Sequence, residues 1–141
     1  MVRQLENPLL LTKVIDLAKN IPDMDAVILS TMLTHALASK RALILISETK
    51  EGEVNGFSFA TIENLDGEDA VFVQATYIKP GEEEKYIGFE LLTKLRLFGK
   101  DNRLNNIYMM TKRNPKAYMR KYKFEFAYTI LKRRILDERP V

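Results

Sequence analysis

The sequence has no cysteine and a single histidine, His35, among its 141 residues. Without cysteine, the chain cannot form disulfides, supply a thiolate nucleophile or hold a zinc or iron–sulfur centre through thiolates. No apolar run approaches the length of a membrane span, and the first residues do not resemble a secretory signal. We therefore expect a cytoplasmic protein without a membrane partner, and we predict no metal site.

The size and composition of the chain are those of one ordinary globular domain. It is 46% hydrophobic and 29% charged, which is enough apolar material to bury a core. Internal repeats, low-complexity tracts and linkers are also lacking. We expect a single domain over residues 1–141.

The net charge of +3 is distributed unevenly. Residues 1–93 contain 8 lysines and arginines against 15 aspartates and glutamates, whereas residues 94–141 contain 14 against 4. The second part therefore predicts a basic surface. Tyrosines interrupt its cations, as on many surfaces that meet nucleic acids, but no helix-turn-helix, RNA-binding sheet or zinc-finger signature accompanies them. A solvated basic face is the simpler interpretation, and a nucleic-acid partner is open but not favoured. Eleven of the cations are Arg96, Lys100, Arg103, Lys112, Arg113, Arg120, Lys121, Lys123, Lys132, Arg133 and Arg134, and the tyrosines among them are Tyr108, Tyr118 and Tyr122.

Hydrophobic periodicity predicts an α/β (α+β) fold with a mixed sheet and helices on its faces. Asn7 and either Asp23 or Asp25 are expected to cap the first two helices, and Gly99 to end the third. An Asp-Gly pair within residues 64–69 predicts an antiparallel hairpin. The predicted strands are 2–6, 41–48, 54–63, 70–79, 106–111 and 124–135, and the predicted helices are 8–19, 25–40, 87–98 and 115–122, in the order β-α-α-β-β-β-α-β-α-β.

The stretch that organises the chain is the passage from a strand into the central helix. Val71 to Ile78 alternate in the manner of a strand, Pro80 ends the run, and apolar residues from Ile87 onward recur at helical spacing. A helix start carries unpaired N–H groups and the positive end of the helix dipole. We therefore expect an anion site here, and a phosphate-bearing ligand is the natural occupant.

Residues 77–92 read Y-I-K-P-G-E-E-E-K-Y-I-G-F-E-L-L. This stretch resembles the acetyl-coenzyme A binding turn of the GNAT N-acetyltransferase superfamily, V-x-P-x-x-[RQ]-x-x-G-x-[GA]-x-x-L-L. Pro80 precedes Gly88 by the family's eight positions, and Leu91 and Leu92 follow in register. The predicted element order is also that of the GNAT fold without an obvious seventh strand, so the resemblance covers nearly the whole chain.

The resemblance implies a mostly antiparallel GNAT-like sheet and an acetyl-CoA-dependent N-acyltransferase, in which an unidentified amine attacks the thioester directly. In that family the backbone of the turn holds the diphosphate, and a tyrosine near the fourth helix protonates the leaving thiolate. Here Tyr118 and Tyr122 flank the expected place. Asn114 opens N-P-K-A, similar to the family's N-x-x-A. The coenzyme contacts implied in this way are Tyr77, Ile78, Glu83, Lys85, Tyr86, Ile87, Gly88, Asn114 and Ala117, with Lys116, Arg120 or Lys121 near the adenosine phosphates.

Two positions of the turn depart from the family pattern, since Glu83 stands at the Arg/Gln position and Tyr86 at that of the first glycine. They leave open an alternative, a catalytically inactive GNAT-fold protein that works by binding a partner. A nucleic-acid-binding module is the third alternative, and a homodimer could form through the final strand. The acyl acceptor is not predicted; loose candidates for its site are His35, Asp23, Asp25 and Glu48.

Overall fold

The computed structural model describes residues 1–81, 84–111, 115–136 and 139, without the side chain of Lys85. The chain forms two compact units, Met1–Thr111 and Lys112–Val141. That the whole chain is one domain stays a prediction. No helix in the part of the chain that the structure describes is long and apolar enough to cross a membrane.

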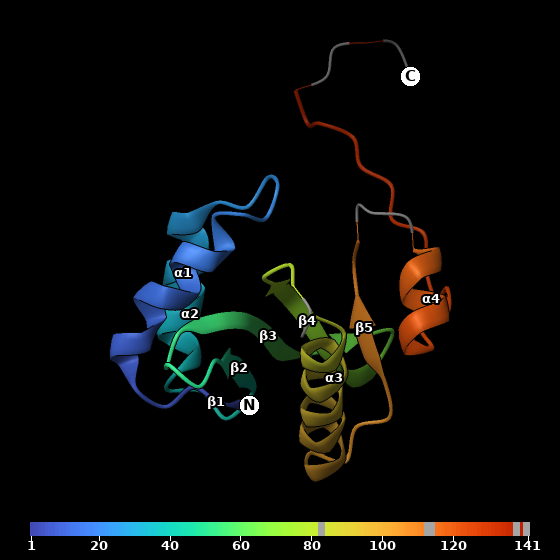
Figure 1. The fold of residues 1–141 in the computed structure, drawn as a ribbon. Coiled ribbons are helices and arrows are strands. Elements are labelled where there is room, and N and C mark those ends of the chain that lie inside the picture. Colours follow the sequence, from blue (N-terminus) through green and yellow to red (C-terminus); the bar gives the residue numbers. More distant parts are fainter. Residues whose placement is uncertain (82–83, 112–114, 137–138, 140–141) are drawn as a thin grey trace. The chain divides into compact units, whose positions relative to one another are not determined.

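The first unit is a five-stranded sheet with helices on both faces (Figure 1). The strands lie in the order β1-β2-β3-β4-β5. The pairs β1–β2, β2–β3 and β3–β4 are antiparallel, and the pair β4–β5 is parallel. The predicted fold class is confirmed. The elements are β1 (Val2–Gln4), η1 (Pro8–Leu10), α1 (Leu11–Ala18), α2 (Ala26–Ala36), β2 (Ala42–Glu48), β3 (Val54–Leu65), β4 (Glu68–Ile78), α3 (Glu84–Asp101) and β5 (Ile107–Met109).

Each face of the sheet has its own hydrophobic core. Helices α1 and α2 cover one face and α3 covers the other (Figure 1). Because successive strand residues point to opposite faces, β2 and β3 contribute to both cores. The core under α1 and α2 includes Val14, Leu33, Ile46, Phe57 and Phe59, and the core under α3 includes Leu45, Ala60, Val71, Leu91 and Leu95.

The local signals for the first two helices and for the hairpin are confirmed. Asn7 Oδ1 accepts a hydrogen bond from the Leu9 N–H, and Asp25 Oδ1 accepts from two N–H groups at the start of α2. Asp66 and Gly67 have φ of 57° and 85°, as a two-residue hairpin turn requires. Helix α2 ends earlier than predicted, because the chain tightens into i→i+3 hydrogen bonds over its last turn.

The prediction that Gly99 ends the central helix is wrong. Helix α3 continues to Asp101, and the residue in the left-handed conformation is Arg103, with φ of 58°. The Leu104 N–H donates to the Gly99 carbonyl at 2.8 Å and closes the end of the helix. Gly99 instead permits close packing, since a Cβ there would lie 3.3 Å from Val71 Cγ2.

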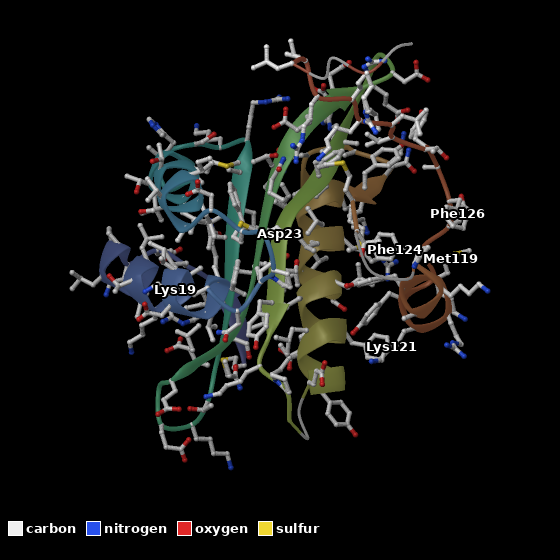
Figure 2. The ribbon with its side chains drawn as sticks, turned by 90° about the horizontal axis from the view of Figure 1, so that it is seen from above. Lys19, Asp23, Met119, Lys121, Phe124 and Phe126 are labelled. Carbon is white, nitrogen blue, oxygen red and sulfur yellow. The ribbon has the colours of Figure 1, made fainter. Side chains whose placement is uncertain are left out.

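The second unit contains α4 (Lys116–Tyr122), as predicted, but no strand over its described residues. The prediction of a final strand over residues 124–135 is therefore wrong. Figure 2 shows Phe124 and Phe126 on the segment that leaves α4. Their period-two pattern fits a strand, but a strand also needs a neighbouring backbone. Phe124 is half-buried, and the apolar side chains that follow it are exposed, with Phe126 at 72% and Ile130 at 68%.

Candidate functional site

β4 carries a bulge at Gln74 that exchanges its two faces. Phe59 of β3 lies opposite Ala75. The next residue of β3, Ala60, lies opposite Val73, so Gln74 is an extra residue in β4. Val73 packs on the α3 face and Ala75 on the face of α1 and α2, although a regular strand would place both on one face. The sequence alternation alone could not show this exchange.

The second half of β4 has an open backbone edge. Among the described residues, β5 pairs with β4 only up to Val73, whereas β4 continues to Ile78. The Lys79 N–H donates to the Asn55 carbonyl on the β3 side at 2.8 Å. Because N–H groups alternate between the two edges of a strand, those of Thr76 and Ile78 face the edge from which β5 is missing. This edge offers hydrogen-bond donors to an extended ligand.

The start of α3 is held close against the sheet beside this edge. Ile87 is 6% exposed and packs on the strands, and Gly88 is also buried. A Cβ on Gly56 would lie 3.2 Å from Ile87 Cγ2, so a larger residue would push the helix away. The small residues on this face of the sheet, Ser47, Gly56 and Ser58, therefore set the height of the first turn of α3.

The turn between β4 and α3 presents backbone donors. Gly81 has open space around it, and the Glu84 N–H donates to the Gly81 carbonyl at 3.3 Å. By helix geometry, the remaining N–H groups of the first turn, up to Tyr86, lack an intrahelical acceptor. The Tyr86 side chain is 69% exposed and Glu84 is also exposed. These donors and the positive end of the helix dipole favour an anion.

A hollow of about 200 Å³ lies on the β2–β3 side of the same turn. Its two carboxylates, Glu53 and Glu84, disfavour an anion, so this hollow is not the expected diphosphate position. The buried Asn55 Oδ1 has no hydrogen-bond partner among the residues that the structure describes. The residues that line the hollow are Thr49, Glu53, Asn55, Lys79, Pro80, Gly81, Glu84 and Ile87.

Comparison with known proteins identifies the fold. No protein-family model and no curated protein matches the sequence. An aminoglycoside 6'-N-acetyltransferase from Acinetobacter haemolyticus has a TM-score of 0.80 at 14% identity, with 97% of this chain and 99% of that chain covered. The chain has the GNAT fold.

Two further solved structures share the GNAT fold with this chain. A protein described as a predicted acetyltransferase from Clostridium acetobutylicum, solved with acetyl-CoA, has a TM-score of 0.79 at 14% identity, with 96% of each chain covered. A glucosamine-6-phosphate N-acetyltransferase from Arabidopsis thaliana has a TM-score of 0.72 at 12% identity, with 96% of this chain and 97% of that chain covered. At these identities the likeness establishes the fold.

The structure brings six of the predicted coenzyme contacts together at the turn. Tyr77 packs on the core under α1 and α2 and its backbone faces β3, whereas Ile78 packs under α3 and offers only its backbone to the open edge. Tyr86, Ile87 and Gly88 lie in the first turns of α3. Lys85 also lies there, and its side chain is outside the described part. Glu83 and Asn114 fall outside the described residues.

The candidates on α4 belong to the second unit and are placed only within it. The rings of Tyr118 and Tyr122 have centroids 6.5 Å apart, and Lys121 Nζ lies 5.9 Å from the Tyr122 centroid. Ala117 is exposed on the same helix. These contacts leave both tyrosine side chains half-buried, and their part in a site with the turn stays a prediction.

The loose acceptor-site candidates have mainly structural surroundings. Asp25 caps α2, and Glu48 forms an ion pair with Arg3. Asp23 adopts a left-handed conformation with φ of 61° between α1 and α2. His35 lies in the last turn of α2 and is exposed.

Sequence reasoning did not find several strand residues that shape the site. Gln74 donates from Nε2 to Thr61 Oγ1 at 2.9 Å, which anchors the bulge residue to β3. The Thr76 and Ser58 hydroxyl groups are 2.9 Å apart beside the open edge. Gly56 lies in a run with strand periodicity, and a glycine inside such a run is a signal for close approach by another element.

Proposed function

We propose that this chain is an acetyl-CoA-dependent N-acyltransferase that moves an acetyl group to an amine by direct attack. One observation carries the proposal: β4 has an open edge after Gln74, and the first turn of α3, which follows it in the chain, is packed against the same sheet through Ile87. An extended chain that ends in a diphosphate matches this surface, because it would find strand-type donors along the edge and helix-start donors at the end.

The groups of the chain would have the following roles in binding and acetyl transfer. The N–H groups of the first turn of α3, up to Tyr86, hold the diphosphate. Those of Thr76 and Ile78 orient the pantetheine arm and polarise the thioester carbonyl. The bound coenzyme supplies the acetyl thioester. The attacking amine would form the new N–C bond and release its proton to solvent, the C–S bond would break, and Tyr118 or Tyr122 would give a proton to the leaving thiolate and regain one from solvent.

Solved structures with the same fold support this assignment. The Clostridium acetobutylicum protein was solved with acetyl-CoA and an aminoglycoside N-acetyltransferase with CoA. The names of two further neighbours give their acceptors. One enzyme acts on aminoglycosides and the other on glucosamine 6-phosphate, and both kinds of acceptor carry amines. The acceptor of this chain is an amine that we leave unassigned.

Titration calorimetry with acetyl-CoA and with CoA tests the proposal first. We expect saturable binding of both at micromolar concentrations, followed by amine-dependent release of CoA thiol in a screen of small amines that includes aminoglycosides and glucosamine 6-phosphate. Dithionitrobenzoate is a clean reagent for the released thiol because the chain has no cysteine. Absence of binding at millimolar ligand would refute the proposal.

The second candidate is a GNAT-fold protein that binds a partner without the coenzyme. The exposed Glu84 carboxylate at the start of α3 favours it, because a negative charge beside the anion site opposes a diphosphate. Acetyl transfer to any amine would exclude this candidate. The homodimer and the cytoplasmic location stay predictions from the sequence.

A further inference from the structure

A second polar surface lies at the other end of α3, far from the proposed coenzyme turn. Arg96, Lys100 and Arg103 follow one another at spacings of four and three residues, which places them on one side of α3 and its C-terminal turn. From Glu84 to Arg96 the helix axis advances about 18 Å. These cations therefore form a surface that is separate from the turn between β4 and α3.

The charge of this surface stands out in its unit. Residues 1–93 carry 8 cations and 15 carboxylates, whereas residues 94–111 carry 4 cations and one carboxylate, Asp101. A local excess of cations on an otherwise acidic unit concentrates positive potential at one position.

The surface is hollowed into a groove of about 390 Å³. This volume lies within the usual range for small-molecule sites. Of the residues that the structure describes, no carboxylate lines it; cations and asparagine amides form the polar part, and Leu104 and Ile107 form an apolar part. The lining residues are Arg96, Gly99, Lys100, Arg103, Leu104, Asn105, Asn106 and Ile107.

The backbone brings the third cation to the groove at a conformational cost. Arg103 has φ of 58°, in the left-handed region where glycine or asparagine is the usual residue at a helix end. The turn is fixed by the Leu104 N–H, which donates to the Gly99 carbonyl. A strained backbone at a charged, concave surface is typical of a functional site.

The side chains of Arg96, Lys100 and Arg103 have no ion-pair or hydrogen-bond partner within the part of the chain that the structure describes. The helix dipole favours positive charge in the last turn, which accounts for Lys100 and Arg103. It does not account for Arg96, which lies more than a turn earlier. Asn105 Nδ2 donates to Glu68 Oε1 at 3.1 Å, which orients one amide of the lining.

We propose that this groove binds a small ligand with two or more phosphate groups. Two guanidinium groups and an ammonium spread over about 10 Å of helix axis match several phosphate oxygens better than one. Guanidinium forks bind phosphate through paired N–H donors. A short, open hollow with an apolar part favours a small molecule over a nucleic-acid backbone, which would need a longer basic track. The proposal does not depend on acetyl transfer.

Calorimetry with inorganic tripolyphosphate tests the proposal on the full chain. We expect tripolyphosphate to bind at least about tenfold more tightly than orthophosphate at low salt. The variant Arg96→Gln, Lys100→Gln, Arg103→Asn should lose at least about tenfold in affinity. Asparagine is chosen at position 103 because it tolerates the left-handed conformation.

A matched control removes the same charge elsewhere. Lys13, Lys40 and Lys50 are exposed cations outside the groove, and their triple change to glutamine should alter the affinity by no more than about twofold. Equal weakening by both triple variants would overturn the proposal, as would unchanged binding in the groove variant. Groove-dependent binding of a thymidine oligonucleotide without tripolyphosphate binding would also overturn it, because the ligand would then be nucleic acid. Circular dichroism and thermal unfolding verify that each variant is folded.

Discussion

Ile87 Cγ2 lies 3.2 Å from the position that a Cβ atom on Gly56 would occupy. This close approach joins the start of β3 to the first turn of α3, whose N–H groups form the proposed diphosphate site. The height of the helix over the sheet therefore depends on a residue that contributes no side chain.

Replacing Gly56 with alanine should weaken acetyl-CoA binding by roughly three- to tenfold, because Ile87 must give way and the first turn moves with it. Calorimetry measures the change. Gly99→Ala is the control, since its Cβ would meet Val71 Cγ2 at a similar 3.3 Å but at the other end of α3. Equal affinities of the two variants would contradict the role of Gly56.

Two buried serines under α3 should respond oppositely to alanine. Ser47 is 1% exposed and its Oγ has no hydrogen-bond partner in the described part of the chain, whereas the Oγ of Ser58 lies 2.9 Å from Thr76 Oγ1. We expect Ser58→Ala to lower the free energy of unfolding by about 1 kcal/mol and Ser47→Ala to raise it by up to about 1 kcal/mol. Urea denaturation at constant slope measures both. A loss of stability in Ser47→Ala as large as that in Ser58→Ala would show that Ser47 has a partner.

Removing the charge of Glu84 should strengthen coenzyme binding while slightly weakening the fold. A carboxylate about 4 Å from a phosphate costs on the order of 1 kcal/mol in water, so Glu84→Gln should lower the dissociation constant of acetyl-CoA by roughly two- to fivefold, more at low salt. The same change removes a favourable charge from a helix start, about 0.3–1 kcal/mol. Asp101→Asn, at the far end of α3, is the control and should leave the affinity unchanged. Weaker binding in Glu84→Gln would place the anion elsewhere.

Local sequence signals predicted most of the fold because they act over a few residues. Asn7 and Asp25 cap helices through their own side chains, and Asp66 with Gly67 sets a turn by itself. The position of the candidate site was predicted on the same basis, since Pro80 ends a strand and α3 follows. These features need no information from distant parts of the chain.

The rest depends on contacts between distant residues. The bulge at Gln74 arises from the register between β3 and β4. Regular alternation over residues 71–78 therefore places the residues after Gln74 on the wrong face of the sheet. Gly99 lies where a helix stop was expected, but its role is to let α3 approach Val71. Periodicity describes one strand, whereas a bulge belongs to a pair.

One of the two α4 tyrosines should prove necessary for turnover. If Tyr118 or Tyr122 protonates the thiolate, its change to phenylalanine should lower kcat by about 100-fold or more with little change in KM. Phenylalanine keeps the ring contact, whose centroids are 6.5 Å apart, so packing is retained and the other tyrosine is the matched control. Full activity in both variants would remove the tyrosines from the mechanism.

The segment after α4 should exchange its amide hydrogens quickly. No strand ladder protects residues 124–135, whereas the amides in the middle of β3 are paired on both sides, so exchange should be complete within seconds in the first and much slower in the second. Hydrogen exchange read by mass spectrometry measures both. A matched pair of variants tests the side chains: Ile130→Ala, at 68% exposure, should change the free energy of unfolding by less than about 0.5 kcal/mol. Phe57→Ala, at 0% exposure, should cost about 3–5 kcal/mol. Slow exchange over residues 124–135 would show that this alternating sequence has found a strand partner after all.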